Sequence, residues 1–256
     1  MGFSPEEVER YARHLVLREI GGAGQQRLAG AKVALVGLGG LGGPAALYLA
    51  AAGIGHLRLI DADQVSLANL QRQILFQTGD VNRAKTLAAA EALARLNRHV
   101  AVDLRPERLG PENAEALLTG MDVVLDGTDS FASRFAINAA CHGLGLPVVS
   151  GAVGRWEGQL SVFASGLRAG APCYACWVPP GIEEAQACAA LGVLGPLTGI
   201  IGAAMALEAI KLITEAGTPL IGHILLYDGL DGSARMVHLA PDPECSVCGL
   251  TTLRQN

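Results

Sequence analysis

The amino-acid sequence predicts an α/β fold of the Rossmann type, in which a mainly parallel sheet is extended by antiparallel strands. Short β-branched runs alternate with helical patterns up to about residue 150, as is typical of parallel strands joined by helices. Beyond Gly151, "EGQLSVFASG", "GHILLYDG" and "SARMVHLA" resemble strands without helices between them. A glycine-rich run, "VGLGGLGG", directly follows the first strand and precedes a helical pattern.

Individual helices, strands and a loop can also be predicted from the sequence. Ser4, Pro5 and Glu7 have the spacing of a capping box that begins the first helix. The helical period is clearest over Arg83–Leu96, and the glycines and prolines of "PCYACWVPPGIEE" predict a long loop. Strands are predicted at Val33–Val36, Leu57–Ile60, Val100–Leu104, Val123–Leu125 and Val148–Ser150.

We expect one domain over residues 1–256, because no repeat or linker divides the chain. Its first half, about residues 1–150, carries the glycine-rich run and the alternating pattern, which predict nucleotide binding. The second half, about residues 151–256, contains predicted strands without helices between them and two Cys-x-x-Cys pairs.

The composition excludes several classes of protein. Half of the residues are hydrophobic and only 17% are charged, which indicates extensive burial rather than disorder. The net charge of −5 argues against nucleic-acid binding. Glycines and a proline interrupt the uncharged runs Val33–Gly55 and Ala189–Leu207, so a buried core explains them better than a membrane span. The charged N-terminal segment is unlike a secretory signal, and we expect a cytoplasmic protein.

The glycine-rich run matches the pattern G-x-G-x-x-G from Gly37 to Gly42. Glycines in this position let backbone N–H groups and a helix N-terminus approach a phosphate. Asp61 follows the next predicted strand, where a carboxylate can accept hydrogen bonds from a ribose. A glycine turn chosen only for close packing is the alternative, and the motif itself fits either a redox dinucleotide or ATP.

Polar and basic residues beyond Asp61 favour a triphosphate over a dinucleotide. They are Asn69, Gln71, Arg72, Gln73 and Lys85. Cleavage of a triphosphate builds negative charge on the leaving group, and cationic and amide donors stabilise that charge. The alternative for Arg72 and Lys85 is an ordinary solvated surface position.

Four cysteines form the pairs "CYAC" (Cys173, Cys176) and "CSVC" (Cys245, Cys248). Two such pairs indicate a closed, structural zinc site, because four thiolates complete a tetrahedral shell. Two disulfides are the alternative. Cys141, in "INAACHGLG", is most simply explained as a core residue.

At this point the chain resembles the MoeB/ThiF family, the bacterial relatives of ubiquitin-activating enzymes. The resemblance is carried by "RYARHLVL", "VGLGGLGG", "LIDADQVSLANLQRQILF", "LDGTDSFASRF", "CYACW" and "CSVCG", in the same order from about Glu9 to Gly249. It implies an ATP-dependent adenylyltransferase that activates the C-terminal Gly-Gly carboxylate of a small ubiquitin-like sulfur carrier and releases pyrophosphate. It also implies Mg²⁺ and Zn²⁺ as cofactors and a homodimer.

The resemblance implies roles for individual residues. Gly37, Gly39, Gly40, Asp61, Asn69, Gln71, Arg72, Lys85 and Asp129 would bind the nucleotide, with Asp129 positioning Mg²⁺. Arg13 would reach the phosphates from the other protomer. Cys188 is a possible acceptor for the activated carrier, although adenylation proceeds without that thiol in some members of the family.

Some alternatives stay open. Asp129 could instead cap the helix that begins near Phe131, and Arg13 could pair with Glu9 on its own helix. An NAD-dependent oxidoreductase and a zinc-clamped scaffold without catalytic activity are the rival functions. The pathway (molybdopterin, thiamine, tRNA thiolation or cysteine synthesis) stays open, and we expect a separate protein to donate the sulfur.

Overall fold

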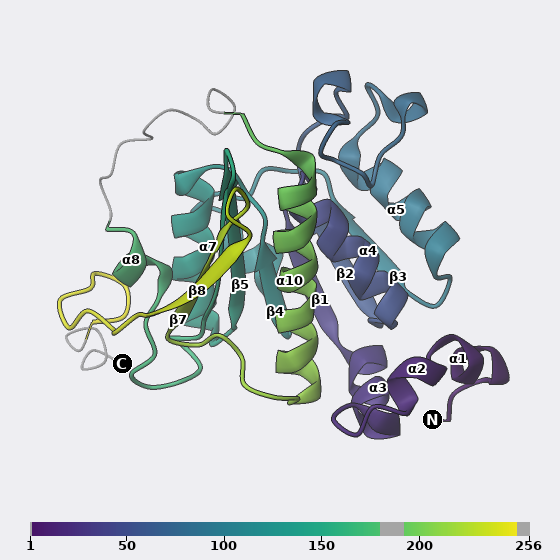
Figure 1. Ribbon diagram of the computed structural model, residues 1–256, viewed down its shortest axis with the longest axis horizontal. Helices are drawn as coiled ribbons and strands as arrows, with labels where there is room; N and C mark the ends of the chain where they lie inside the picture. Colours follow the sequence, from purple (N-terminus) through teal and green to yellow (C-terminus); the bar gives the residue numbers. More distant parts are fainter. Residues whose placement is uncertain (1, 180–191, 250–256) are drawn as a thin grey trace.

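The computed structural model describes residues 2–179 and 192–249 (Figure 1). The helices are α1 (Pro5–Arg10), α2 (Ala12–Leu15), α3 (Gly21–Gly30), α4 (Gly42–Ala52), α5 (Lys85–Leu96), α6 (Ala114–Leu118), α7 (Phe131–Leu144), α8 (Tyr174–Trp177) and α10 (Gly195–Thr214). The strands are β1 (Lys32–Val36), β2 (His56–Ile60), β3 (Ala101–Arg105), β4 (Val123–Asp126), β5 (Val148–Gly154), β6 (Glu157–Phe163), β7 (His223–Asp228) and β8 (Ser233–His238). Two 3₁₀ turns, η1 (Leu67–Asn69) and η2 (Thr78–Asp80), lie between β2 and α5.

One eight-stranded sheet runs through the molecule in the order β3-β2-β1-β4-β5-β6-β7-β8. The first five strands of this order are parallel, and the last three join them in antiparallel fashion. The predicted fold class and all eight predicted strands are therefore confirmed. β5 is longer than predicted because its last four residues pair with the antiparallel neighbour β6.

Helices cover both faces of the sheet. Alternate residues of β1 point to opposite sides: Val33 and Leu35 pack with α3, α4, α5 and α10, whereas Ala34 and Val36 pack with α6, α7 and α8. Because both faces are covered, the central strands β1 and β4 are largely apolar, whereas β2 and the edge strand β3 carry the charged residues Arg58 and Asp103.

Local details differ from the prediction in small ways. The capping box of Ser4 and Glu7 is confirmed, whereas the helix predicted from Arg83 begins at Lys85. The loop predicted around "PCYACWVPPGIEE" contains the short helix α8. Cys141 is buried in the core, as predicted, and this burial raises the pKa of its thiol to about 12.

The helix α10 is long and apolar enough to cross a membrane by length and composition alone, the single such helix in the part of the chain described. Half of its most apolar window is buried inside the protein. It packs on α3, α4, β5 and β6, so contacts within the core account for much of its apolar character.

The strand order reverses direction between β1 and β4, and this position defines the site. The helix that follows β1 covers one face of the sheet and the helix that follows β4 covers the other. In such sheets the diverging connections leave a crevice outside the carboxyl ends of the two strands. The glycine-rich run follows β1 and the "DGTDS" segment follows β4, so both lie at this crevice.

Candidate active site

A cleft of about 1390 Å³ opens at the carboxyl ends of the parallel strands. This is larger than a typical small-molecule pocket of roughly 300–1,000 Å³. One part of its wall comes from the loops after β1, β2 and β4, and another part from the antiparallel strands. The second part includes Gln159, Tyr227 and Arg235, so both halves of the chain contribute to one cavity.

Gly37, Gly39 and Gly40, the glycines predicted to approach the nucleotide, line the cleft. Gly37 has a φ of +84°, and a Cβ on it would lie 3.0 Å from the carbonyl oxygen of Gly127, so this turn requires glycine. A Cβ on Gly39 would meet no protein atom closer than 3.6 Å. The protein itself therefore leaves room in front of Gly39, where a ligand could approach the backbone.

Asp61 is buried directly after β2. Its Oδ2 accepts a hydrogen bond from the N–H of Leu38 at 2.7 Å, and its Oδ1 accepts one from the N–H of Asp63 at 2.8 Å. Burial raises the pKa of Asp61, while the Lys85 ammonium and the two N–H donors act in the opposite direction. These contacts fix the carboxylate beside the glycine-rich run.

Lys85 is buried, with only 5% of its side chain exposed, so the surface alternative for this residue is wrong. Its Nζ lies 2.9 Å from Oδ2 of Asp63 and 3.7 Å from Oδ2 of Asp61. Arg108 also approaches Asp63, at 3.8 Å, and lines the cleft. Arg108 follows β3 and carries no motif signal, so the sequence did not predict it as a site residue.

Asn69 and Arg72 are half-buried, and the Nη2 of Arg72 donates to Oδ1 of Asn69 at 2.9 Å. Both line the cleft together with the exposed Gln71. The neighbouring Gln73 is 4% exposed, and its Oε1 finds no hydrogen-bond partner among the described residues. Buried amides normally have partners, so this oxygen is available to a ligand or a water molecule in the cleft.

Asp129 is exposed on the wall of the cleft. It does not cap the following helix: the N-cap of α7 is Ser130, whose hydroxyl faces the N–H of Ser133 at 3.5 Å. The capping alternative for Asp129 is therefore wrong. Within the described residues, no hydrogen bond or ion pair occupies its carboxylate.

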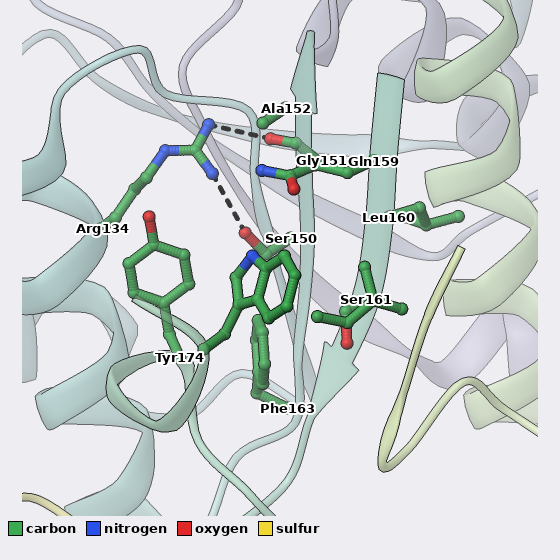
Figure 2. Close-up of a pocket in the computed structure, with 11 residues that line it drawn as sticks. Arg134, Ser150, Gly151, Ala152, Gln159, Leu160, Ser161, Phe163 and Tyr174 are labelled. Carbon is green, nitrogen blue, oxygen red and sulfur yellow. Dashed lines mark hydrogen bonds between the residues drawn. The ribbon is translucent and has the colours of Figure 1, made fainter. Parts of the chain in front are cut away.

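A buried ion pair between Arg134 and Asp126, in the same segment as Asp129, was not predicted from the sequence. Arg134 and Asp126 are 7% and 2% exposed, and Nη1 of Arg134 lies 3.6 Å from Oδ2 of Asp126. Figure 2 shows the guanidinium group of Arg134 pointing from α7 to the backbone and hydroxyl groups of β5. Both residues lie within "LDGTDSFASRF". The signal available in the sequence was an acid at the end of a predicted strand and an arginine on the following helix, five residues after Asp129.

Arg13 is exposed on α2 and does not line the cleft of its own chain. The helices α1–α3 lead into the amino end of β1, at the corner of the molecule marked N in Figure 1, whereas the cleft lies at the carboxyl ends. Among the described residues Arg13 forms no ion pair, so its predicted alternative partner Glu9 is not engaged. Cys188 lies outside the described residues.

The four predicted cysteine ligands come together. Their Sγ atoms all lie within 4.8 Å of one another, with neighbouring pairs at 3.4 Å, 3.6 Å and 4.0 Å. A disulfide needs about 2.05 Å, so the disulfide alternative is wrong. Zn–S bonds of about 2.3 Å in a tetrahedron place the sulfurs about 3.8 Å apart, which matches this cluster. Cys173, Cys176, Cys245 and Cys248 can therefore hold a metal ion between α8 and the segment after β8.

The sheet order and the position of the cleft define a protein of the doubly wound α/β class. A family model described as the ThiF family matches residues 11–247. The chain belongs to this family, as the resemblance in the sequence predicted.

Named relatives extend over nearly the whole chain. The sulfur carrier protein adenylyltransferase of Thermus thermophilus is 42% identical over 253 residues, covering 97% of this chain and 93% of that protein. The molybdopterin-synthase adenylyltransferase of Escherichia coli K12 is 43% identical over 246 residues, covering 96% and 98%.

Solved structures share the fold. PaaA matches with a TM-score of 0.80 and 26% identity, over 94% of this chain and 76% of that one. MccB of E. coli, solved with the peptide MccA-N7isoASN, matches with a TM-score of 0.82 and 23% identity, over 94% and 74%. These structures support the arrangement of the sheet and its helices.

Proposed function

We propose that the protein is an ATP-dependent adenylyltransferase that activates the C-terminal carboxylate of a small ubiquitin-like sulfur carrier ending in Gly-Gly. The observation that carries this proposal is a single cleft in which a glycine turn, the buried carboxylate of Asp61 and two cations adjoin a separate wall of antiparallel strands. The names of the relatives, a sulfur carrier protein adenylyltransferase and a molybdopterin-synthase adenylyltransferase, support the same activity.

The residues of the cleft suit this reaction. The terminal carboxylate of a carrier is ionised at neutral pH, with a pKa near 3.5, so it attacks the α-phosphate without a general base.

The main barrier to this attack is electrostatic repulsion between the carboxylate and the triphosphate. Arg72 and Lys85 neutralise the phosphates, Asn69 orients Arg72, and Gly37, Gly39 and Gly40 let the backbone approach the nucleotide. Gln71 borders the same cavity and Asp61 holds the ribose.

Mg²⁺ would be held at Asp129. Carboxylate oxygens are the ligands this ion prefers, and the Asp129 carboxylate is exposed to the cleft and unpaired among the described residues. When bound, Mg²⁺ supplies positive charge to the phosphates. The four-cysteine cluster would hold Zn²⁺, a structural metal, because four thiolates leave no position for water.

The antiparallel wall offers room for the carrier tail. A nucleotide leaves much of the cleft free, and the remaining part is lined by residues of β6, β7 and β8 such as Gln159, Tyr227 and Arg235. An extended Gly-Gly end is narrow enough to reach from this wall to the glycine-rich run. A separate sulfur donor in the cytoplasm would complete the pathway, and Cys188 stays a candidate acceptor.

The test is carrier-dependent exchange of labelled pyrophosphate into ATP. With Mg²⁺ and a purified carrier ending in Gly-Gly, we expect exchange that disappears when the last glycine is removed. A carrier lacking that glycine is the matched control. Tight NADH binding without exchange would instead support the oxidoreductase alternative, and ATP binding without exchange would support the scaffold.

A homodimer would bring Arg13 to the phosphates of the other protomer. Apolar side chains are exposed on α10 and the adjoining α4, where Ile200, Leu207 and Tyr48 are 46%, 57% and 58% exposed. Such side chains are suited to a symmetric interface. Arg13 does not line the cleft of its own chain, so it could reach the phosphates only from the other protomer.

Mixing two inactive variants tests this arrangement. Arg13→Ala and Arg72→Ala should each lose exchange activity. After the subunits exchange at random, about half of the dimers should be heterodimers, in which one of the two sites has both arginines, so the mixture should regain about a quarter of wild-type activity. Light scattering checks the oligomeric state. A fully active monomer, or no recovery on mixing, would remove Arg13 from the site.

Nucleotide binding should weaken as the pH falls. Burial raises the pKa of Asp61, so its carboxyl takes up a proton at a higher pH than an ordinary aspartate, whose pKa is about 3.9. The protonated form accepts ribose hydroxyl hydrogen bonds poorly. The same shift means that the contribution of Asp61 to the free energy of unfolding falls as the pH rises through its folded-state pKa.

Calorimetric titration with ATP and Mg²⁺ from about pH 8 to about pH 5 measures this effect. Affinity should decline with acidification in the wild type. The variant Asp61→Asn should bind more weakly but with a flatter pH profile. Parallel profiles for the two proteins would contradict a role for the Asp61 carboxylate in binding.

A further inference from the structure

Arg134 lines the cleft and joins three segments of its wall. Its Nη2 donates to the carbonyl oxygens of Thr128, in the loop after β4, and Gly151 of β5, the latter at 2.8 Å. Its Nη1 donates to the hydroxyl of Ser150 at 3.3 Å and lies 3.6 Å from Asp126. The planar guanidinium group can make all of these contacts at once, which a lysine ammonium at the end of a flexible stem cannot.

These contacts determine where Asp129 points. The carboxylate of Asp129 has no hydrogen-bond partner among the described residues, so the backbone of its loop sets its direction. Thr128, the preceding residue, is anchored from two sides. Its N–H and hydroxyl donate to Oδ1 of Asp126 at 3.1 Å and 2.7 Å, and its carbonyl oxygen accepts from Arg134.

Tyr174 closes the other side of Arg134. The guanidinium carbon lies 6.0 Å from the centre of the Tyr174 ring, and the rings of Phe135 and Phe163 pack edge-on against that ring. The small niche beside Arg134, shown in Figure 2, has a volume of about 10 Å³. That is room for about one water molecule, so no substrate group fits in this niche, although Arg134 and Tyr174 also line the large cleft.

We propose that Arg134, which lies over the Tyr174 ring, is a positioning residue that orients Asp129 toward the Mg²⁺ of the proposed reaction by fixing the backbone of Thr128. This inference rests on the proposed adenylyltransferase function. Under this proposal Arg134 acts through Thr128 and Asp129 rather than on the substrate, so its loss should alter the Mg²⁺ requirement of the reaction.

The experiment measures carrier-dependent pyrophosphate exchange as a function of Mg²⁺ concentration. Arg134→Lys keeps the charge opposite Asp126 but cannot span Thr128 and Gly151. We expect about a hundredfold loss of rate at low Mg²⁺, as for a misplacement of about 1 Å, with partial recovery at high Mg²⁺. The KM for the carrier should not change. Thr128→Val, which removes the hydroxyl anchor of the same loop and leaves Arg134 intact, should shift the Mg²⁺ curve in the same direction.

Arg95→Ala is the matched control. Arg95 is exposed on α5, does not line the cleft and forms no ion pair among the described residues, so its Mg²⁺ curve should coincide with that of the wild type. Thermal unfolding confirms that each variant is folded, and Thr128→Val decides the question if Arg134→Lys does not fold.

Each result has one meaning. A higher Mg²⁺ requirement in folded Arg134→Lys or Thr128→Val supports the proposal. A wild-type Mg²⁺ curve in the folded variants, or a loss of rate that is equal at every Mg²⁺ concentration, overturns it while the proposed function stands. Absence of exchange in the wild type, by contrast, refutes the proposed function itself.

Discussion

Replacing Arg72 and Lys85 together with alanine should abolish transfer of AMP to the carrier. Lys85 is buried between Asp61 and Asp63, and Arg72 is held by Asn69 at the same cleft. If each cation lowers the barrier by about 2–4 kcal/mol, as oxyanion donors do, the double variant should be at least about a thousandfold slower. Carrier-dependent pyrophosphate exchange measures the loss.

The matched control for this experiment is Arg95→Ala. Arg95 lies on the same helix as Lys85, α5, but is exposed and forms no ion pair among the described residues. Its replacement should leave the exchange rate unchanged. Removal of Lys85 leaves Asp61 buried without its ammonium partner, so folding must be verified by thermal unfolding. The single variant Arg72→Ala avoids that complication. Undiminished exchange in the folded double variant would contradict the proposed triphosphate chemistry.

Loss of one ligand of the cysteine cluster should cause the largest fall in stability. Cys245→Ser replaces a sulfur that lies 3.6 Å from the sulfur of Cys173, and this pair connects α8 with the segment after β8. Loss of a structural metal should lower the free energy of unfolding by more than about 4 kcal/mol, which corresponds to a fall in Tm of more than about 8 °C for a chain of this size. Thermal unfolding and a zinc assay on the denatured protein measure both effects.

Cys141→Ala is the control for the cysteine prediction. Cys141 is a buried cysteine of the core outside the cluster, so its replacement should leave the zinc content unchanged. A Cys245→Ser protein with the same zinc content and Tm as the Cys141→Ala variant would argue against Cys245 as a metal ligand, and absence of zinc from both proteins would argue against a zinc site.

Most of the fold could be predicted from the sequence because local and global signals agree. The central strands β1 and β4 are short apolar runs, each followed by a helical period, and the capping box of Ser4 and Glu7 specifies where α1 begins. The helix α8 escaped prediction because four residues with a cysteine at the third position carry no helical period. Its position depends on contacts made by residues far apart in the chain.

The candidate site was only partly predictable. Residues in motifs, such as Arg72 and the four cysteines, were found because their spacing carries chemical meaning. Arg108 and Arg134 were missed because their roles depend on tertiary proximity: Arg108 approaches Asp63 from the loop after β3, and Arg134 reaches β5 from α7. Burial of Lys85 was equally invisible, since a lysine at the start of a helix is usually exposed.

The long helix α10 has a consequence for protein engineering. It lies directly behind the glycine-rich run: a Cβ on Gly202 would be 2.5 Å from the carbonyl oxygen of Leu41, and one on Gly40 would be 3.0 Å from Thr198. A recombinant fragment ending near residue 150 would lack this support and expose Leu41 and Leu49 to solvent. We therefore expect the N-terminal half to resist transplantation into chimaeric enzymes, because its glycine-rich turn is braced by a helix some 150 residues further along the chain.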